Sequence, residues 1–271
     1  MAIVRQYGRP SLFITFTANP KWDEITRELL LGQQATDRPD LVARVFHMKV
    51  NHLLHDLKRN QIFGRYKGSV WTIEYQKRGL PHLHLLLFLD PYDRDRLLDP
   101  AVVNRFVCAE IPRPENDPDG LLTSVITRMM IHGPCGQHNP QAPCMVTRAT
   151  GHLPTCSKRF PKRFSPVTII REDGYPEYRR RDNGQFIPIQ LPGRNGDLIH
   201  LDNRWVVPYN PYLSRKYRAH INVEVCASVQ AVKYIHKYIY KGTDRATIRV
   251  DQDNEITQYL QGRYIGPSEA I

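Results

Sequence analysis

Alternating and helical patterns of apolar residues predict a few regular elements. Residues 11–17 (SLFITFT) alternate apolar and hydroxyl side chains before Asn19-Pro20, which predicts a strand. Between residues 41 and 57, apolar positions recur close to the helical spacing, which predicts an amphipathic helix that covers a sheet. Residues 69–75 and 82–89 are two β-rich runs joined by QKRGLP, a sequence typical of a turn, so we expect an antiparallel hairpin.

The second half of the chain has a different pattern. Residues 108–215 contain 14 of the 21 prolines, which predicts a loop-rich, basic insertion with Cys and His residues. Residues 220–225 (HINVEV) then predict a strand, and residues 228–241 predict a helix with Ser228 as its N-cap and Gly242 as its stop.

Composition and charge narrow the function classes. The 271 residues are 41% hydrophobic and 24% charged, which indicates a globular chain with its own core. No apolar run reaches the roughly 20 residues of a membrane span, and no signal peptide is evident, so we expect a soluble, unsecreted protein. The net charge of +11 favours a polyanionic partner, either nucleic acid or a membrane surface.

Two histidines on the predicted hairpin have the spacing of metal ligands. His82 and His84 flank one leucine, so on a strand they project from the same face. Glu74 on the partner strand supplies an oxygen ligand, and Gln76 on the same face is the alternative. Such a site suits Mg²⁺ or Mn²⁺ that polarises a phosphate oxygen. The competing interpretation is that the two histidines only line a polar sheet face.

The predicted last helix carries candidate nucleophiles. Tyr234, Tyr238 and Lys241 fall on one helical face, within about 60° of arc. A phenol can attack a phosphodiester if a cation offsets the developing charge. The competing interpretation is an aromatic core stripe, for which Tyr240 on another face is the better candidate.

The insertion contains a possible structural zinc site. Cys135, Cys144 and Cys156 are the best candidate ligands, with His132 or His138 as the fourth. The alternative is a set of free thiols in a packed loop, because the spacing follows no strict zinc-finger pattern.

Several segments together resemble a known family. FITFTANP, EYQKRGLPHLHLLLF and YIHKYIYK resemble, in this order, the three motifs of HUH endonucleases with two catalytic tyrosines. MIHGPCGQHNPQAPCM, CSKRFPKRF and DGYPEYRRR are similar to the replication-initiator (Rep) domain of Helitron transposases. The resemblance extends over almost the whole chain, so we treat residues 1–271 as one such domain with the insertion at 108–215.

The resemblance implies an α+β, ferredoxin-like fold with a five-stranded antiparallel sheet and flanking helices. It also implies that His82, His84 and either Glu74 or Gln76 hold the metal. Tyr234 and Tyr238 would each attack single-stranded DNA at transposon ends, form a 5′-phosphotyrosine link and release a 3′-hydroxyl. A nuclear location follows from this role.

The family normally continues into a superfamily 1 helicase. No GxxxxGK[ST] loop occurs in these 271 residues, so we expect that unwinding comes from a helicase outside them.

A basic segment is the predicted contact with DNA. Residues 158–181 contain eight Lys or Arg and three acidic residues, with Phe160, Phe164, Tyr175 and Tyr178 between them. Basic groups neutralise phosphates and aromatic rings stack on unpaired bases, although a solvated basic face is the alternative. The predicted DNA-binding residues are Lys77, Arg78, Lys158, Arg159, Lys162, Arg163, Arg179, Arg180 and Arg181.

The sequence thus predicts a metal-dependent single-stranded DNA endonuclease and strand transferase. The alternatives are a catalytically inactive or domesticated DNA-binding remnant, and an RNA-binding or ribonuclease module. The RNA module gives no role to the paired tyrosines.

Overall fold

The structure is a computed structural model that describes residues 6–75, 79–147, 153–170, 176–190, 198–227, 245–249 and 259–263. The predicted helix with Tyr234, Tyr238 and Lys241 lies outside the described residues, and so does the 76–78 turn.

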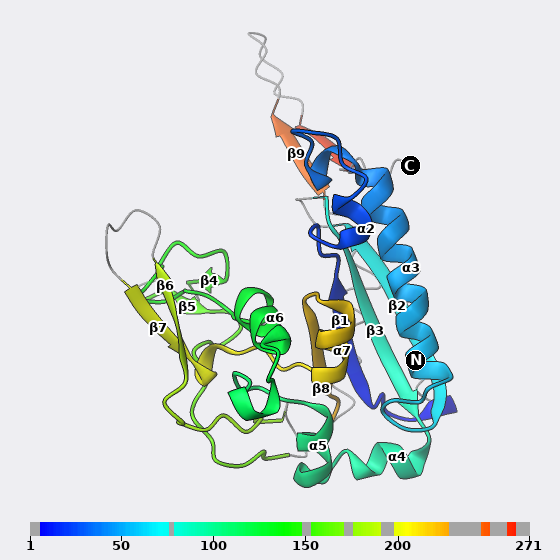
Figure 1. Cartoon of the computed structure of the whole chain (residues 1–271), viewed down its shortest axis with the longest axis vertical. Coiled ribbons are helices and arrows are strands. Elements are labelled where there is room, and N and C mark those ends of the chain that lie inside the picture. The colour runs from blue at the N-terminus through cyan, green and yellow to red at the C-terminus, as the bar shows by residue number, and fades with distance from the viewer. Residues whose placement is uncertain are drawn as a thin grey trace.

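An antiparallel sheet organises the N-terminal part of the chain (Figure 1). Its strands are β1 (Leu12–Thr17), β2 (Tyr66–Tyr75), β3 (Pro81–Leu89) and β8 (Ile221–Val225), in the order β2-β3-β1-β8. The predicted strands and the β2–β3 hairpin are therefore confirmed, as is the α+β class. In the described residues this sheet has four strands, so the five-stranded ferredoxin-like arrangement is not established.

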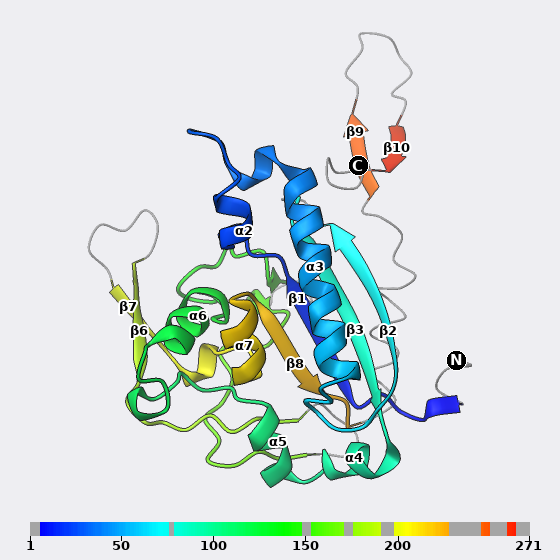
Figure 2. The same cartoon turned by 45° about the vertical axis from the view of Figure 1, so that its right-hand side comes forward.

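Helix α3 (Pro39–Lys58) covers one face of the sheet, as its pattern predicts (Figure 2). Every second residue of β1 and β3 points toward it, because side chains alternate between the two faces of a strand. The buried core on this face includes Leu12, Ile14, Phe16, Leu83, Leu85, Leu87, Val45, Phe46, Val50, Leu53, Val223 and Val225.

Short elements fill the remainder of the described chain. The helices are α2 (Asp23–Thr26), α4 (Pro91–Arg96), α5 (Pro100–Phe106), α6 (Leu121–Met129) and α7 (Pro211–Tyr217), with 3-10 turns η1 (Ala35–Asp37), η2 (Pro114–Asn116) and η3 (Asn203–Trp205). The further strands form three antiparallel pairs, β4 (Met145–Val146) with β5 (Thr155–Cys156), β6 (Phe186–Gln190) with β7 (Leu198–Asp202), and β9 (Arg245–Arg249) with β10 (Tyr259–Arg263). No helix among the described residues is long and apolar enough to span a membrane.

The insertion is more ordered than its proline content suggests. It lies beside the sheet and contains α6, most of α7 and two of the small strand pairs (Figure 1). Two clusters of buried side chains give it cores of its own, one around Ile126, Met130 and Tyr209 and the other around Cys135 and Trp205.

A buried carboxylate joins helix α3 to helix α7. Asp56 is 1% exposed and accepts hydrogen bonds from Lys216 Nζ at 2.7 Å, Tyr217 Oη at 2.6 Å and Asn60 Nδ2 at 2.8 Å. Burial by itself raises the pKa of Asp56, but the bonds from Lys216, Tyr217 and Asn60 outweigh it and lower that pKa. The network therefore ties the end of the insertion to the helix that covers the sheet.

We expect Asp56→Ala to lower the free energy of unfolding by about 3 kcal/mol, because it removes one partner of a buried charged network. Urea denaturation followed by circular dichroism measures this loss. The control is Glu115→Gln, whose carboxylate pairs with Arg113 at an exposed site, and we expect a change below about 0.5 kcal/mol. Because the pKa of Asp56 is lowered in the folded state, its stabilisation is present above the unfolded value of about 3.9 and is lost as the pH falls below it.

Candidate functional site

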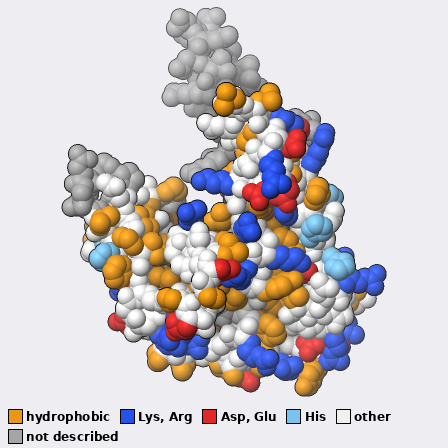
Figure 3. All heavy atoms as spheres, viewed as in Figure 1, with side chains coloured by type: hydrophobic (Ala, Val, Ile, Leu, Met, Phe, Trp, Pro, Cys, Tyr) orange, Lys and Arg blue, Asp and Glu red, His pale blue; other side chains and the backbone are white. Residues whose placement is uncertain are grey.

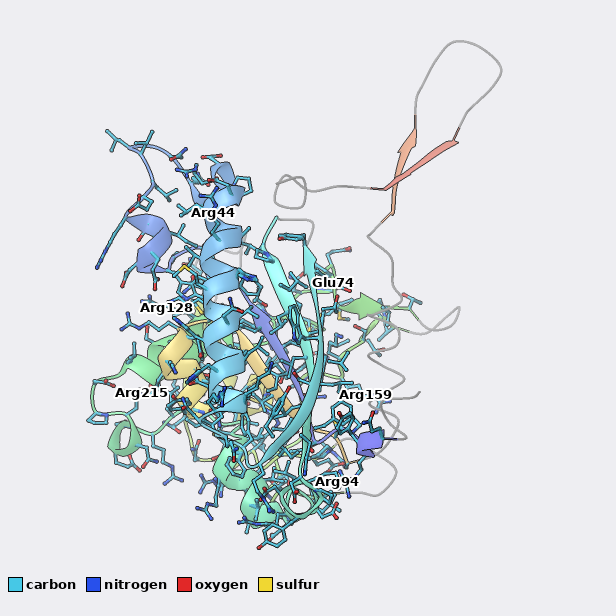
Figure 4. The ribbon with its side chains drawn as sticks, turned by 90° about the vertical axis from the view of Figure 1, so that its right-hand side faces the viewer. Arg44, Glu74, Arg94, Arg128, Arg159 and Arg215 are labelled. Carbon is cyan, nitrogen blue, oxygen red and sulfur yellow. The ribbon has the colours of Figure 1, made fainter. Side chains whose placement is uncertain are left out.

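The face of the sheet that points away from α3 carries two rows of polar side chains. Across β2, β3 and β1, the register places Glu74 opposite His82 and His82 opposite Thr17. The next row runs from Thr72 to His84, Thr15 and Asn222. In Figure 4, the labelled Glu74 lies on the other side of the sheet from α3 and its labelled Arg44. The hairpin therefore brings the two predicted histidine ligands and the predicted carboxylate to one face.

The two histidines are held in defined orientations. Their ring centroids are 4.5 Å apart, and His82 Nδ1 lies 2.6 Å from the Thr17 hydroxyl. His84 Nε2 lies 3.5 Å from Glu74 Oε2, and the His84 ring stacks on Phe13. The Thr17 contact involves Nδ1 of His82, so its Nε2 is the atom left to bind a metal.

Burial keeps the His82 imidazole neutral. Burial, with smaller contributions from the neighbouring His84 and His220, lowers the pKa of His82 to about 3. Neutral imidazole is the form that ligates a metal. The fit of donors supports a divalent-cation site made of His82, His84 and Glu74.

His220 is a residue that the sequence analysis did not single out. The Thr17 backbone N–H donates to the His220 carbonyl, and His220 influences the pKa of His82, so it lies beside the same row. Its buried Nδ1 has no hydrogen-bond partner among the described residues. In the sequence, His220 and Asn222 are two residues apart in HINVEV, so on a strand they lie on the same face. Only the pairing of β8 with β1 shows that this face is the one that carries the histidine pair.

The second cluster lies in the insertion. Ligand atoms of His132, Cys135, Cys144 and Cys156 all lie within 4.8 Å of one another, and Cys156 Sγ is 3.4 Å from His132 Nε2. These four residues could bind a metal ion such as zinc. The sequence left His132 and His138 as alternatives, and the structure brings His132 into the cluster.

Local geometry explains why His132 belongs to the cluster. His132 follows α6, and its backbone N–H donates to the Trp205 carbonyl at 2.8 Å. The chain then turns at Gly133, where φ is 121° and an added Cβ would lie 2.9 Å from the Trp205 ring. Only glycine fits this close approach, which directs Cys135 back toward His132.

The three thiols differ in their surroundings. Burial, together with the adjacent Cys144 and Cys156, raises the pKa of Cys135 to about 12. Burial also acts to raise the pKa of Cys156, but hydrogen bonds from the backbone of Phe160 and Lys158 and from the Cys144 and Cys135 side chains together outweigh it and lower that pKa. Cys156 is therefore the one of these three thiols whose pKa is lowered.

The predicted DNA-binding residues divide into two groups. In the first, Lys158, Arg159 and Arg163 are exposed, and the Arg163 side chain is 86% exposed. Lys162 is partly buried, and its ammonium lies 4.9 Å from the centre of the Phe160 ring. This segment, residues 158–163, can present several cations to a phosphate backbone.

The second group is a correction to the sequence analysis. Arg180 is 3% exposed and its Nη1 donates to the carbonyls of Ala109, Asn203 and Val206. A guanidinium enclosed in this way cannot contact DNA, so its predicted phosphate contact is wrong. The sequence misled because an arginine run is usually solvated, whereas here backbone carbonyls compensate the burial of the charge.

The flanking arginines have internal partners as well. Arg181 forms a two-pronged pair with Glu110, with Nη2 at 2.5 Å from Oε2, and Arg179 Nε lies 3.7 Å from the same oxygen. Tyr178 is also buried, and its hydroxyl accepts from the Val225 backbone N–H, so it cannot stack on bases. Tyr175 lies outside the described residues.

Positively charged side chains are distributed over the surface. Figure 3 shows Lys and Arg side chains spread over the visible face rather than gathered in one patch. The net charge of +11 therefore does not by itself locate a nucleic-acid path.

We expect Arg180→Ala to lower the free energy of unfolding by about 3 kcal/mol, because three buried carbonyls lose their donor. Arg163→Ala is the matched control, and its change should stay within about 0.5 kcal/mol because that side chain is exposed. Urea denaturation of both variants measures the difference. Equal, small effects would show that Arg180 is not a structural anchor.

Comparison with known proteins agrees with the resemblance in the N-terminal part of the chain. No curated protein matches the chain. Residues 1–87 match the family described as "Helitron helicase-like domain at N-terminus", and this segment includes β1, β2 and most of β3. His82, His84 and Glu74 all lie within the matched residues. The part of the chain that carries the histidine pair is therefore similar to the N-terminal domain of Helitron helicase-like proteins.

Proposed function

We propose that this protein is a metal-dependent single-stranded DNA endonuclease and strand transferase of a Helitron-type rolling-circle transposase. The observation that carries the proposal is the cross-strand grouping of His82, His84 and Glu74 on one sheet face, inside the segment that matches the Helitron-like family. Two imidazoles and a carboxylate leave coordination positions open for a phosphate oxygen.

Mg²⁺ or Mn²⁺ is the cofactor that suits this proposal. His82, His84 and Glu74 would hold it, with Gln76 as the alternative to Glu74. The 3.5 Å separation of Glu74 and His84 favours the carboxylate. When bound, the ion supplies Lewis-acid polarisation of the scissile phosphate. The Thr17 hydroxyl contributes by fixing the orientation of the His82 ring.

Tyr234 and Tyr238 are the proposed nucleophiles. The phenolic oxygen of one of them forms a bond to the scissile phosphorus, and the bond from phosphorus to the 3′-oxygen breaks. The phenol loses its proton and the departing 3′-oxygen gains one, which leaves a 5′-phosphotyrosine and a free 3′-hydroxyl. A 3′-hydroxyl can reverse the step without ATP, because one phosphodiester replaces another. Lys241 would offset the charge that develops on the phosphate.

The basic segment 158–163 would hold the DNA strand. Lys158, Arg159 and Arg163 are exposed on it, and the rings of Phe160 and Phe164 are partly buried beside them. In the hairpin turn, Lys77 and Arg78 would contact the backbone near the scissile phosphate. This assignment replaces the arginine run at 179–181, whose side chains serve internal contacts.

The wider context of the reaction belongs to the same proposal. Transposon ends would be the substrate, a helicase would supply the single strand, and the nucleus would be the location. A fifth strand in the sheet and the 228–241 helix would complete a ferredoxin-like HUH fold.

Formation of a covalent adduct tests the proposal. We expect the wild-type chain with Mn²⁺ to become attached to single-stranded oligonucleotides that are randomised in sequence and labelled at the 3′ end, because the attached fragment keeps that end. Labelling at the 5′ end should instead give a shorter free product. Tyr234→Phe and Tyr238→Phe should each retain some adduct, whereas the double variant should form none, as measured on denaturing gels.

Tyr240→Phe is the control, since that side chain is predicted on another helical face, and it should leave the adduct yield unchanged. An adduct on the double variant would overturn the tyrosine assignment. Cleavage without an adduct would indicate hydrolysis, and DNA binding without cleavage would favour the inactive remnant.

A second experiment addresses the metal. The double variant His82→Ala/His84→Ala should lose at least about 100-fold in cleavage while it keeps most of its affinity for single-stranded DNA, because phosphate contacts dominate that affinity. Exposed histidines on α3 provide a matched control, and His47→Ala/His52→Ala should cleave as the wild type does. Undiminished cleavage by the first variant would eliminate the site.

Separate variants identify the third ligand by their affinity for the metal. Glu74→Ala should weaken Mn²⁺ binding, measured by calorimetric titration, by at least about tenfold, and by more than Gln76→Ala does. A larger loss in Gln76→Ala would transfer that role to the carboxamide.

A further inference from the structure

The ligand atoms in the insertion are arranged for a tetrahedral ion. In a zinc site with bonds of about 2.3 Å to sulfur and about 2.0 Å to nitrogen, neighbouring ligand atoms lie about 3.5–3.8 Å apart. Cys156 Sγ and His132 Nε2 are 3.4 Å apart, and no pair among the four ligand atoms exceeds 4.8 Å. Small side-chain rotations would therefore bring all four atoms to bonding distance of one centre.

The donor set selects the metal. Three thiolates and one imidazole in tetrahedral positions suit Zn²⁺, whereas Mg²⁺ and Ca²⁺ require oxygen ligands. All four positions would be filled by protein, which is the pattern of a structural site rather than of a catalytic one that keeps an open position. Cys135 and Cys156 are 1% and 6% exposed, so the centre is enclosed.

The region around the four ligands consists of short elements and a small hydrophobic core. The four ligands come from a turn after α6, from the residue before β4 and from β5, and these two strands have only two residues each. Cys135 and Cys156 themselves make up two of the five buried members of the local core, which also contains Ala142, Leu201 and Trp205. A small core of this kind gains its stability from a metal more readily than from apolar burial.

Groups around the ligands support them as an outer shell does in zinc sites. The His132 ring stacks on Phe160 with 4.2 Å between the ring centroids. Strand pairing places Met145 opposite Cys156, and the Ser157 N–H donates to the Cys144 carbonyl at 2.7 Å. Backbone N–H groups of Lys158 and Phe160 approach the Cys156 sulfur. Such donors stabilise a thiolate that binds a metal.

We propose that His132, Cys135, Cys144 and Cys156 form a structural zinc site that fixes the start of the basic segment 158–163. Cys156 lies two residues before Lys158, and the Arg159 N–H donates to the Cys156 carbonyl at 2.9 Å. The further end of the segment is attached where the Lys162 N–H donates to the Arg204 carbonyl. The zinc site would thus hold these cations in place for a DNA strand, a consequence that rests on the proposed function.

The test is the zinc content of the untagged chain, purified without added metal and measured by inductively coupled plasma mass spectrometry. We expect about one zinc per chain, as a site with four protein ligands requires. Counting in the His82→Ala/His84→Ala background removes any ion held by the sheet face. Substitution with Co²⁺ should give the intense visible absorption of a tetrahedral site with thiolate ligands.

Matched variants assign the ligands. His132→Ala and Cys144→Ser should lose zinc, whereas His138→Ala, in the same turn, and Cys108→Ser, outside the cluster, should keep it. Absence of zinc from the wild-type chain, or equal loss in His132→Ala and His138→Ala, would overturn the assignment. The wild-type measurements stand even where a ligand variant fails to fold.

DNA affinity separates the two proposals. Removal of zinc with a chelator should weaken binding of a single-stranded oligonucleotide by at least about tenfold, through loss of several phosphate contacts. Zinc binding without any phosphotyrosine adduct would support this site and overturn the proposed nuclease. An adduct from a zinc-free chain would do the reverse. Unchanged DNA affinity after zinc removal would eliminate the role in holding the basic segment.

Discussion

Strand β3 is hydrogen-bonded on both sides, to β2 and to β1, and its alternation of side chains sets the two environments of the sheet. Leu83, Leu85 and Leu87 point into the core under α3, so His82 and His84 must point the other way. A shift of one residue in this register would bury the imidazoles under α3 and expose the leucines. Core packing therefore fixes the position of the candidate metal ligands, and the site depends on the hydrophobic face opposite it.

In the insertion, where the apolar clusters are small, buried polar groups fix the positions of the loops. Arg180 satisfies three carbonyls from two separate segments. Glu110 accepts from Arg181, and Asn203 accepts from the Ile111 N–H. Such groups give directional contacts that define one arrangement of irregular loops. Part of the positive charge of the chain thus maintains its structure, and only the remainder is available to a polyanionic partner.

Local pattern was sufficient to predict some elements and not others. The strands β1, β2, β3 and β8 and the helix α3 were predictable because each shows its own periodicity. The hairpin also made the grouping of Glu74 with the histidines predictable, since a short turn sets the register. His220 was missed because its proximity to His82 comes from a pairing between distant parts of the chain.

The sequence could not predict which charged side chain is buried or where the backbone packs closely against a ring. Nothing in the run at 179–181 distinguishes the enclosed Arg180 from the exposed Arg163, because the difference lies in carbonyls contributed by other segments. The choice of His132 over His138 likewise depends on the turn at Gly133 against Trp205.

The pairing of β1 with β8 places Leu12 opposite Val225. The backbone hydrogen bonds on this edge of β1 can therefore form only after a strand more than 200 residues later in the chain has been made. While the chain is being synthesised, β1 can pair with β3, but its other edge stays open until the insertion has emerged and β8 follows. The Asp56 contacts with Lys216 and Tyr217 become available only at the same late stage. The segment that matches the family, residues 1–87, therefore ends before the strand that pairs with the second edge of β1 and before Lys216 and Tyr217. During synthesis the insertion emerges before the sheet can be completed.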